Sequence, residues 1–164
     1  MAIEGFSIQS LWMLVRRLPP FLTRWYFTRE KLAGLVYVDV QPRGDSVSID
    51  LGQTASFQIY LQVINLSPFQ IELDRASFDF WCAGVILNAS ILNRKTINVG
   101  EIASVSIRNL IPDGHANQIA KQMKHNPFAL SGNIEFNCAA RSFPKNIGHL
   151  DQINARVFNE SARS

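Results

Sequence analysis

The side chains that most often perform chemistry are few in this sequence and widely spaced. His115 and His125 lie near one predicted helix, but ten helical positions correspond to a rotation of about 1000°, which leaves the two imidazoles on different faces. His149 is distant in sequence. A zinc site requires further ligands at short spacing. We therefore expect no metal site and no cofactor.

Acidic residues offer a second possible chemistry, because paired carboxylates can act as general acid and base. Glu72, Asp74 and Asp79 alternate with apolar residues, so we expect them on the solvated face of a strand. The phosphate-binding, dinucleotide, zinc-protease and nucleophile-elbow motifs are all absent from the sequence. We predict no catalytic residues and no enzymatic activity, and the sequence identifies no small-molecule substrate.

Two cysteines, Cys82 and Cys138, each fall within an alternating apolar run. This placement favours two reduced thiols in the core. A disulfide would need an oxidising compartment, and we expect no cleavable signal peptide that would deliver the chain to one.

Composition and charge describe one ordered domain with a basic end. Hydrophobic residues make up 47% of the 164 residues and charged residues 18%. Five of the sixteen basic residues, but only two of the thirteen acidic ones, fall within residues 1–31. The net charge of +3 therefore belongs to the N-terminal segment. This distribution argues against a nucleic-acid-binding core and directs any electrostatic partner to one end.

From residue 34 onwards, apolar residues alternate with polar ones, as in half-buried strands. The clearest run is ASFQIYLQVIN at residues 55–65, and one helix is predicted over residues 113–125. We expect a mainly β protein, an antiparallel fibronectin- or immunoglobulin-like sandwich of about seven strands with one late helix. Its inner face should comprise Phe57, Ile59, Leu61, Val63, Phe69, Ile71, Phe78, Phe80, Ile134 and Phe136.

Single residues within these runs carry predictions of their own. Gly84 should mark a bulge or hairpin bend, and Gly132 should break a strand. Trp81 alternates with core residues, so its side chain should point outwards, towards the N-terminal segment or a partner. Asn65 and Asn88 should occupy turns because of their dihedral preferences.

The order of elements resembles a known family from about residue 34 to residue 158. The segments FQIYLQVIN and LSPFQIEL, then INVGEIASVSIRNLI, and finally a helix followed by LSGNIEF carry the resemblance. They are similar to the folded, atypical late-embryogenesis-abundant proteins and their bacterial relatives, the water-stress and hypersensitive-response (WHy) domain. Asn65 and Pro68 match in part the asparagine-proline turn of that family, although the turn here reads Asn-Leu-Ser-Pro.

The resemblance implies a fibronectin-like sandwich without enzymatic activity. It also implies a stress-linked, protective function associated with lipid or membrane. Residues 1–33 fall outside the match, and related chains often carry a membrane or lipoprotein anchor in that position.

The N-terminal stretch LWMLVRRLPPFLTRWYFTREK, residues 11–31, is too interrupted to cross a membrane. A spanning helix needs about 20 largely apolar residues. Here Arg16, Arg17 and Arg24 fall within the window, and Pro19 and Pro20 break the helix.

Two short amphipathic helices explain the same stretch better, with Pro20 as the first residue of the second. Aromatic, aliphatic and basic residues in this mixture are typical of a helix lying on an anionic membrane surface. The predicted contact residues are Leu11, Trp12, Val15, Arg16, Arg17, Phe21, Leu22, Arg24, Trp25, Tyr26 and Lys31.

An amphipathic helix that caps its own sandwich, or one that docks onto another protein, would show the same stripe. The protein would then be a structural subunit of a larger assembly. Nucleic acid is disfavoured, because base-stacking aromatics should lie among the cations rather than along an apolar stripe. We expect a membrane-associated protein on the cytoplasmic face, with a basic helical segment (1–33), a sandwich domain (34–158) and a polar tail (159–164).

Overall fold

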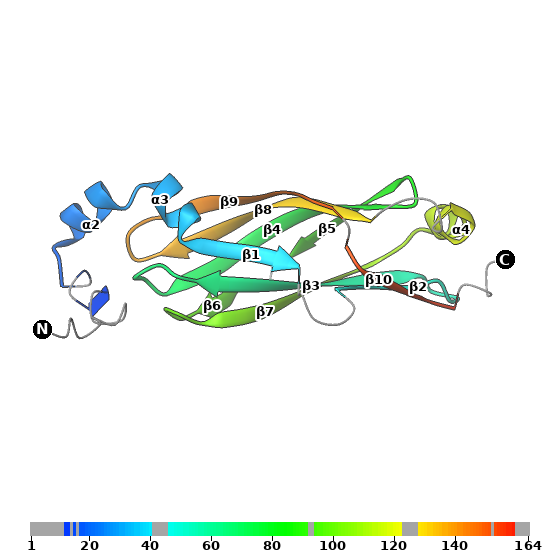
Figure 1. Cartoon of the computed structure of the whole chain (residues 1–164), viewed down its shortest axis with the longest axis horizontal. Helices are drawn as coiled ribbons and strands as arrows, with labels where there is room; N and C mark the ends of the chain where they lie inside the picture. The colour runs from blue at the N-terminus through cyan, green and yellow to red at the C-terminus, as the bar shows by residue number, and fades with distance from the viewer. Residues whose placement is uncertain are drawn as a thin grey trace, which may run out of the picture.

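The computed structural model describes residues 12–13, 15, 17–40, 46–91, 94–122, 128–151 and 153–159. The molecule is an elongated sandwich of two sheets (Figure 1). Helices α2 (Pro20–Tyr26) and α3 (Arg29–Gly34) lie at one end, and α4 (Asp113–Gln122) lies at the other.

The first sheet is built around the long strand β3 (Ser56–Asn65). On one edge β3 pairs antiparallel with β7 (Ile102–Leu110). On the other edge it pairs with β1 (Val36–Val40) at one half and β2 (Val47–Asp50) at the other, both antiparallel. Strand β10 (Ala155–Phe158) lies outside β2 and runs parallel to it.

The second sheet is antiparallel throughout and is built around β4 (Ile71–Cys82). One edge of β4 pairs with β5 (Val85–Ile91) and β6 (Lys95–Ile97). The other edge pairs with β8 (Ala129–Cys138), and β9 (Phe143–Leu150) lies outside β8.

The core lies between the sheets and confirms the predicted sandwich. All ten residues assigned to the inner face are buried, with at most 7% of any of them exposed. The rings of Phe57 and Phe80, one from each sheet, stack with centroids 5.7 Å apart. Alternation identified these strands because one face of each sheet is buried and the other is solvated.

The described residues form ten strands rather than about seven. The C-terminal part of the chain is divided between the sheets, because β9 ends at Leu150 in one sheet and β10 begins at Ala155 in the other. The pairing of β10 with β2 is also parallel, whereas an antiparallel sandwich was expected. The division into segments 1–33, 34–158 and 159–164 stays a prediction.

The late helix begins at Asp113 as predicted, and its buried residues are Ala116 and Ile119. Residues 123–127, which include the predicted end of the helix, lie outside the described part of the chain. Gly84, with φ of +76°, follows Ala83 in the turn between β4 and β5, so the predicted hairpin bend is confirmed.

Gly132 does not break its strand, because β8 continues through it. The irregularity is instead in the pairing with β9, whose register shifts between Ser131 and Asn133. Gly132 is paired with Phe78 of β4, and a Cβ atom at Gly132 would lie 2.4 Å from the Phe78 ring and 2.6 Å from the Ser77 carbonyl oxygen. A glycine therefore stands here because the ring covers its backbone.

Cys82 and Cys138 are both free thiols, as predicted. Cys82 is fully buried, and burial raises its pKa to about 12. Cys138 is only half-buried, and its sulfur donates to the Arg141 carbonyl oxygen at 3.2 Å.

Asn65 is buried at the point where the chain leaves β3 for the other sheet. Its Nδ2 donates to the carbonyl oxygens of Phe69 (2.8 Å), Ile97 (3.2 Å) and Asn98 (3.1 Å). Its Oδ1 accepts from the backbone N–H and the hydroxyl of Ser67. The prediction that dihedral preference explains Asn65 is therefore incomplete, since its amide also ties the β3–β4 connection to the end of β6.

Candidate functional site

Two short helices form the N-terminal end of the molecule. Pro20 opens α2 with the φ angle that a helix requires. The Thr28 hydroxyl accepts a hydrogen bond from the Lys31 N–H at 3.3 Å and caps α3. Within the described residues, neither these helices nor α4 are long and apolar enough to cross a membrane.

One side of these helices packs on the sandwich through a few buried residues. Thr23, Phe27 and Leu32 are at most 7% exposed. The Phe27 ring meets Phe69 edge to face, with centroids 5.2 Å apart. Thr23 satisfies its hydroxyl within α2 by donating to the Pro20 carbonyl oxygen at 2.9 Å.

Hydrogen bonds to backbone carbonyl groups fix the orientation of the helices. Arg24 Nε donates to the Ala140 carbonyl oxygen at 3.1 Å, and the Arg141 guanidinium donates back to the Arg24 carbonyl oxygen. Lys145 Nζ donates to the Ala33 carbonyl oxygen at 2.9 Å. These bonds come from the β8–β9 turn and from β9, so the helices are attached to one sheet at several points.

The opposite side of α2 carries large apolar residues that the sandwich does not cover. Leu18 is 44% exposed, Phe21 69%, Leu22 38% and Trp25 79%. Phe21, Leu22 and Trp25 lie along one side of α2, since Trp25 follows the other two by four and three positions, and Leu18 lies just before the helix. We call these four residues the outer stripe.

Exposed basic residues lie close to the outer stripe in the sequence. Arg17, Arg29 and Lys31 are exposed. Lys31 Nζ lies 4.1 Å from the centre of the Tyr26 ring, an arrangement in which the cation is attracted to the aromatic face. Arg24 is exposed as well, although its Nε bonds to the sandwich.

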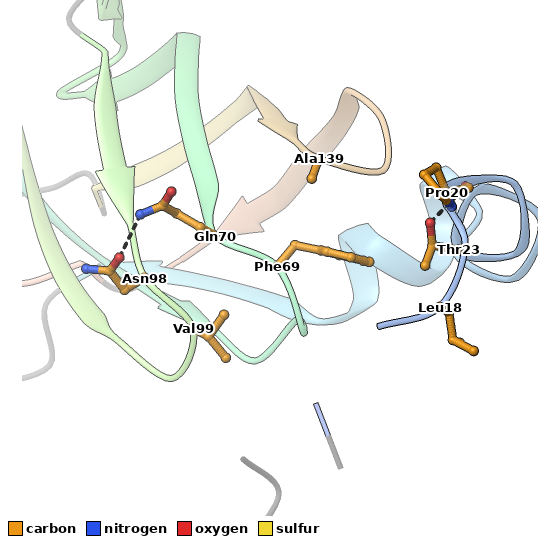
Figure 2. A pocket seen from close by; sticks show the side chains of 8 residues that line it. All are labelled: Leu18, Pro20, Thr23, Phe69, Gln70, Asn98, Val99 and Ala139. Carbon is orange, nitrogen blue, oxygen red and sulfur yellow. Dashed lines mark hydrogen bonds between the residues drawn. The ribbon is translucent and has the colours of Figure 1, made fainter. Parts of the chain in front are cut away.

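Two pockets lie beside these helices. The mixed pocket, about 670 Å³, separates Leu18, Pro20 and Thr23 from the sandwich residues Phe69, Gln70, Asn98, Val99 and Ala139 (Figure 2). Its polar wall is ordered, because Gln70 Nε2 donates to Asn98 Oδ1 at 2.8 Å. Sequence reasoning assigned Phe69 only to the core and gave no signal for Asn98 or Ala139.

The apolar pocket, about 550 Å³, also has Leu18 in its lining. Its walls include Trp12, Val15, Phe27 and Leu35, with Tyr26, Lys31 and Gly34 completing the lining. Trp12 and Val15 are half-buried and pack against the core, so they do not belong to the outer stripe. Leu11 and Arg16 lie outside the described residues.

Trp81 is not near the N-terminal helices. It lies beside the β4–β5 turn, whose Gly84 is close to Gln118 and Gln122 of α4. The Trp81 ring contacts His149 edge to face, with centroids 5.1 Å apart. The suggestion that Trp81 meets the N-terminal segment is therefore wrong.

The acidic residues occupy the solvated face of β4, as predicted. Arg94 lies 3.7 Å from Glu72 and 3.3 Å from Asp74. Asp79 accepts from Asn88 at 2.6 Å, and Asn88 lies within β5 rather than in a turn. In the described part of the chain, no group of three or more His, Cys, Asp or Glu side chains could hold a metal ion.

The sequence matches no protein-family model and no curated protein. Several solved structures share its fold at low identity. An X-ray structure of a structural genomics target is 12% identical over 73% of this chain and 87% of its own, with a TM-score of 0.50. A solution structure from Arabidopsis thaliana is 14% identical over 73% and 85% of the two chains (TM-score 0.48). A candidate late embryogenesis abundant (LEA) protein is 12% identical over 92% of each chain (TM-score 0.40).

At 12% identity the first of these structures supports the fold and assigns no function. The absence of an enzymatic activity in this chain stays a prediction.

Proposed function

We propose that this protein is a non-enzymatic module that attaches reversibly to anionic membrane surfaces through the outer stripe of α2. The observation that supports this proposal most strongly is which side of α2 faces the sandwich and which side faces solvent. Its buried residues Thr23 and Phe27 already dock it on the sandwich, yet Phe21 and Trp25 remain 69% and 79% exposed. A helix that served only as a cap would turn its largest apolar side chains inwards.

Two forces would act together at the membrane. Burial of a side chain such as Phe21 contributes about 1.5 to 3 kcal/mol if it becomes complete. Each basic residue near an anionic surface adds about 1 kcal/mol. The electrostatic contribution is screened over roughly 8 Å at physiological salt, so attachment should weaken as salt rises.

We also propose a distant relationship to the LEA and WHy sandwich proteins, with a stress-related role. The shared sandwich architecture supports the relationship. So does the position of Asn65, which matches the asparagine of the family turn and is held by five side-chain hydrogen bonds. A stress-related role follows from the resemblance alone.

Flotation of the intact chain with vesicles tests the membrane proposal. On vesicles of mixed phosphatidylglycerol and phosphatidylcholine, the intact chain should float. A double variant, Phe21→Ser with Trp25→Ser, should bind at least tenfold more weakly, because the apolar contribution is lost. The matched control is Ile102→Ser with Leu110→Ser, which removes two side chains of similar exposure from β7. This control should bind within about twofold of the intact chain.

A second pair of variants tests the electrostatic contribution to membrane binding. Arg17→Gln with Arg29→Gln should reduce the preference for phosphatidylglycerol over pure phosphatidylcholine. Arg108→Gln with Lys121→Gln, which removes two exposed cations elsewhere, should leave it unchanged. Failure of the intact chain to float on anionic vesicles would overturn the membrane proposal.

A structural subunit of a larger assembly is the second candidate. The mixed pocket favours it, since Leu18 of the outer stripe lines this pocket together with the hydrogen-bonded polar pair Gln70 and Asn98, a mixture found at many protein interfaces. A stoichiometric protein partner in detergent-free extract would support this candidate if the Phe21→Ser, Trp25→Ser variant no longer retained it.

A further inference from the structure

We propose that the apolar pocket binds one molecule of a free fatty acid, with the alkyl chain inside the pocket and the carboxylate at Lys31. This function goes beyond attachment to a membrane surface. It concerns a single amphiphile taken up from solution, whereas the outer stripe would act on a bilayer.

The lining of the apolar pocket matches an alkyl chain. Five of its lining residues have aliphatic or aromatic side chains: Trp12, Val15, Leu18, Phe27 and Leu35. Its volume of about 550 Å³ lies within the range of roughly 300 to 1,000 Å³ that is usual for small-molecule sites. Such walls offer water few hydrogen-bond partners, so an apolar occupant is favoured.

Lys31 supplies the charge that selects the head group. Among the described residues that line the pocket it is the one with a charged side chain, and its amine lies 4.1 Å from the centre of the Tyr26 ring. None of the ion pairs found among the described residues involves Lys31. The amine is thus held beside the apolar walls and can pair with a carboxylate.

Substitution of Gly34 offers a direct test of the pocket. It lines the apolar pocket, and a Cβ atom placed there would meet no atom within 4 Å. A larger side chain can therefore be added at this edge of the pocket without displacing the protein around it. Gly114 in α4 is equally open and lies at the other end of the molecule, so it offers a matched control.

The experiment is a calorimetric titration of the intact chain with dodecanoate, below its micelle concentration and without vesicles. We expect saturable binding of one dodecanoate per chain. Gly34→Leu should weaken it at least tenfold by occupying the pocket, whereas Gly114→Leu should leave it within twofold. Lys31→Gln should weaken dodecanoate binding by about fivefold, as expected for a partly exposed ion pair, and should leave dodecanol binding unchanged.

Separate readouts distinguish this proposal from membrane attachment. Phe21→Ser with Trp25→Ser should retain dodecanoate binding, and Gly34→Leu should still float with anionic vesicles. Absence of saturable dodecanoate binding, or binding that survives Gly34→Leu, would overturn the pocket assignment. Equal affinity of the intact chain and Lys31→Gln for dodecanoate would overturn the role of Lys31.

Discussion

Asn65 uses both ends of its amide to hold the connection between the sheets. Its NH₂ group serves three carbonyl oxygens, and its oxygen accepts two hydrogen bonds from Ser67. Since the residue is 0% exposed, water cannot replace any of these bonds when one partner is lost. This connection precedes Phe69, the residue against which Phe27 and the N-terminal helices pack.

Asn65→Ala should lower the free energy of unfolding by about 3 kcal/mol, because several buried polar groups lose their partner. Asn88→Ala is the matched control, since Asn88 is exposed and its loss should cost less than about 0.5 kcal/mol. Urea unfolding of both variants measures the difference. Equal stability of the two would show that the Asn65 amide is not required.

For single residues such as Asn65, the sequence predicted the local turn but not the hydrogen-bond partners of the side chain. Its neighbours Leu66, Ser67 and Pro68 predict a turn. Two of the accepting carbonyl groups belong to Ile97 and Asn98, more than thirty residues further along the chain. Contacts of that range depend on how β4 and β6 pair, which local pattern does not encode.

At the scale of elements, β4 and β8 approach closely because a ring lies over a glycine. The Phe78 side chain is 2% exposed and is paired across the strands with Gly132. The bulge in the β8–β9 pairing lies at the same position. The missing Cβ atom of Gly132 thus allows β4 and β8 to approach closely.

Gly132→Ala should destabilise the protein by about 1 to 3 kcal/mol, because the added methyl group overlaps both the Phe78 ring and a backbone oxygen. The same substitution at Gly114 should leave stability unchanged or raise it slightly, since that site is open and helical. Thermal unfolding compares the pair. A Gly132→Ala variant as stable as Gly114→Ala would contradict the close approach.

The spacing of apolar and polar residues predicted strands and helices best where one face of the strand or helix is buried. This spacing identified β3 and β4 for that reason, but it does not show that the chain changes sheets between β9 and β10. The amphipathic pattern also found the outer stripe without showing which way it faces. Thr23 and Phe27, which decide that direction, are not conspicuous in the sequence.

At the scale of the whole molecule, the candidate contact surface lies at one end of the long axis. The outer stripe lies on α2 and just before it, whereas Trp81 belongs to the end of β4 next to the β4–β5 turn, and Gly84 of that turn is close to α4 at the opposite end (Figure 1). Membrane attachment through α2 therefore places the molecule end-on, with the sandwich extending away from the bilayer.

Quenching by brominated lipids tests the end-on orientation. A variant that retains only Trp25, made by Trp12→Phe with Trp81→Phe, should lose most of its emission on anionic vesicles. A variant that retains only Trp81, made by Trp12→Phe with Trp25→Phe, should keep nearly all of it. Comparable quenching of both tryptophans would indicate that the molecule lies on its side.

The parallel pairing of β10 with β2 has a consequence for synthesis on the ribosome. Strand β2 ends at Asp50, but the strand that covers its outer edge is complete only at Phe158. Throughout elongation between these two points, the outer edge of β2 presents unpaired backbone groups to other nascent chains. The order of strands along the polypeptide thus sets how long the outer edge of β2 stays unpaired and open to binding by a chaperone.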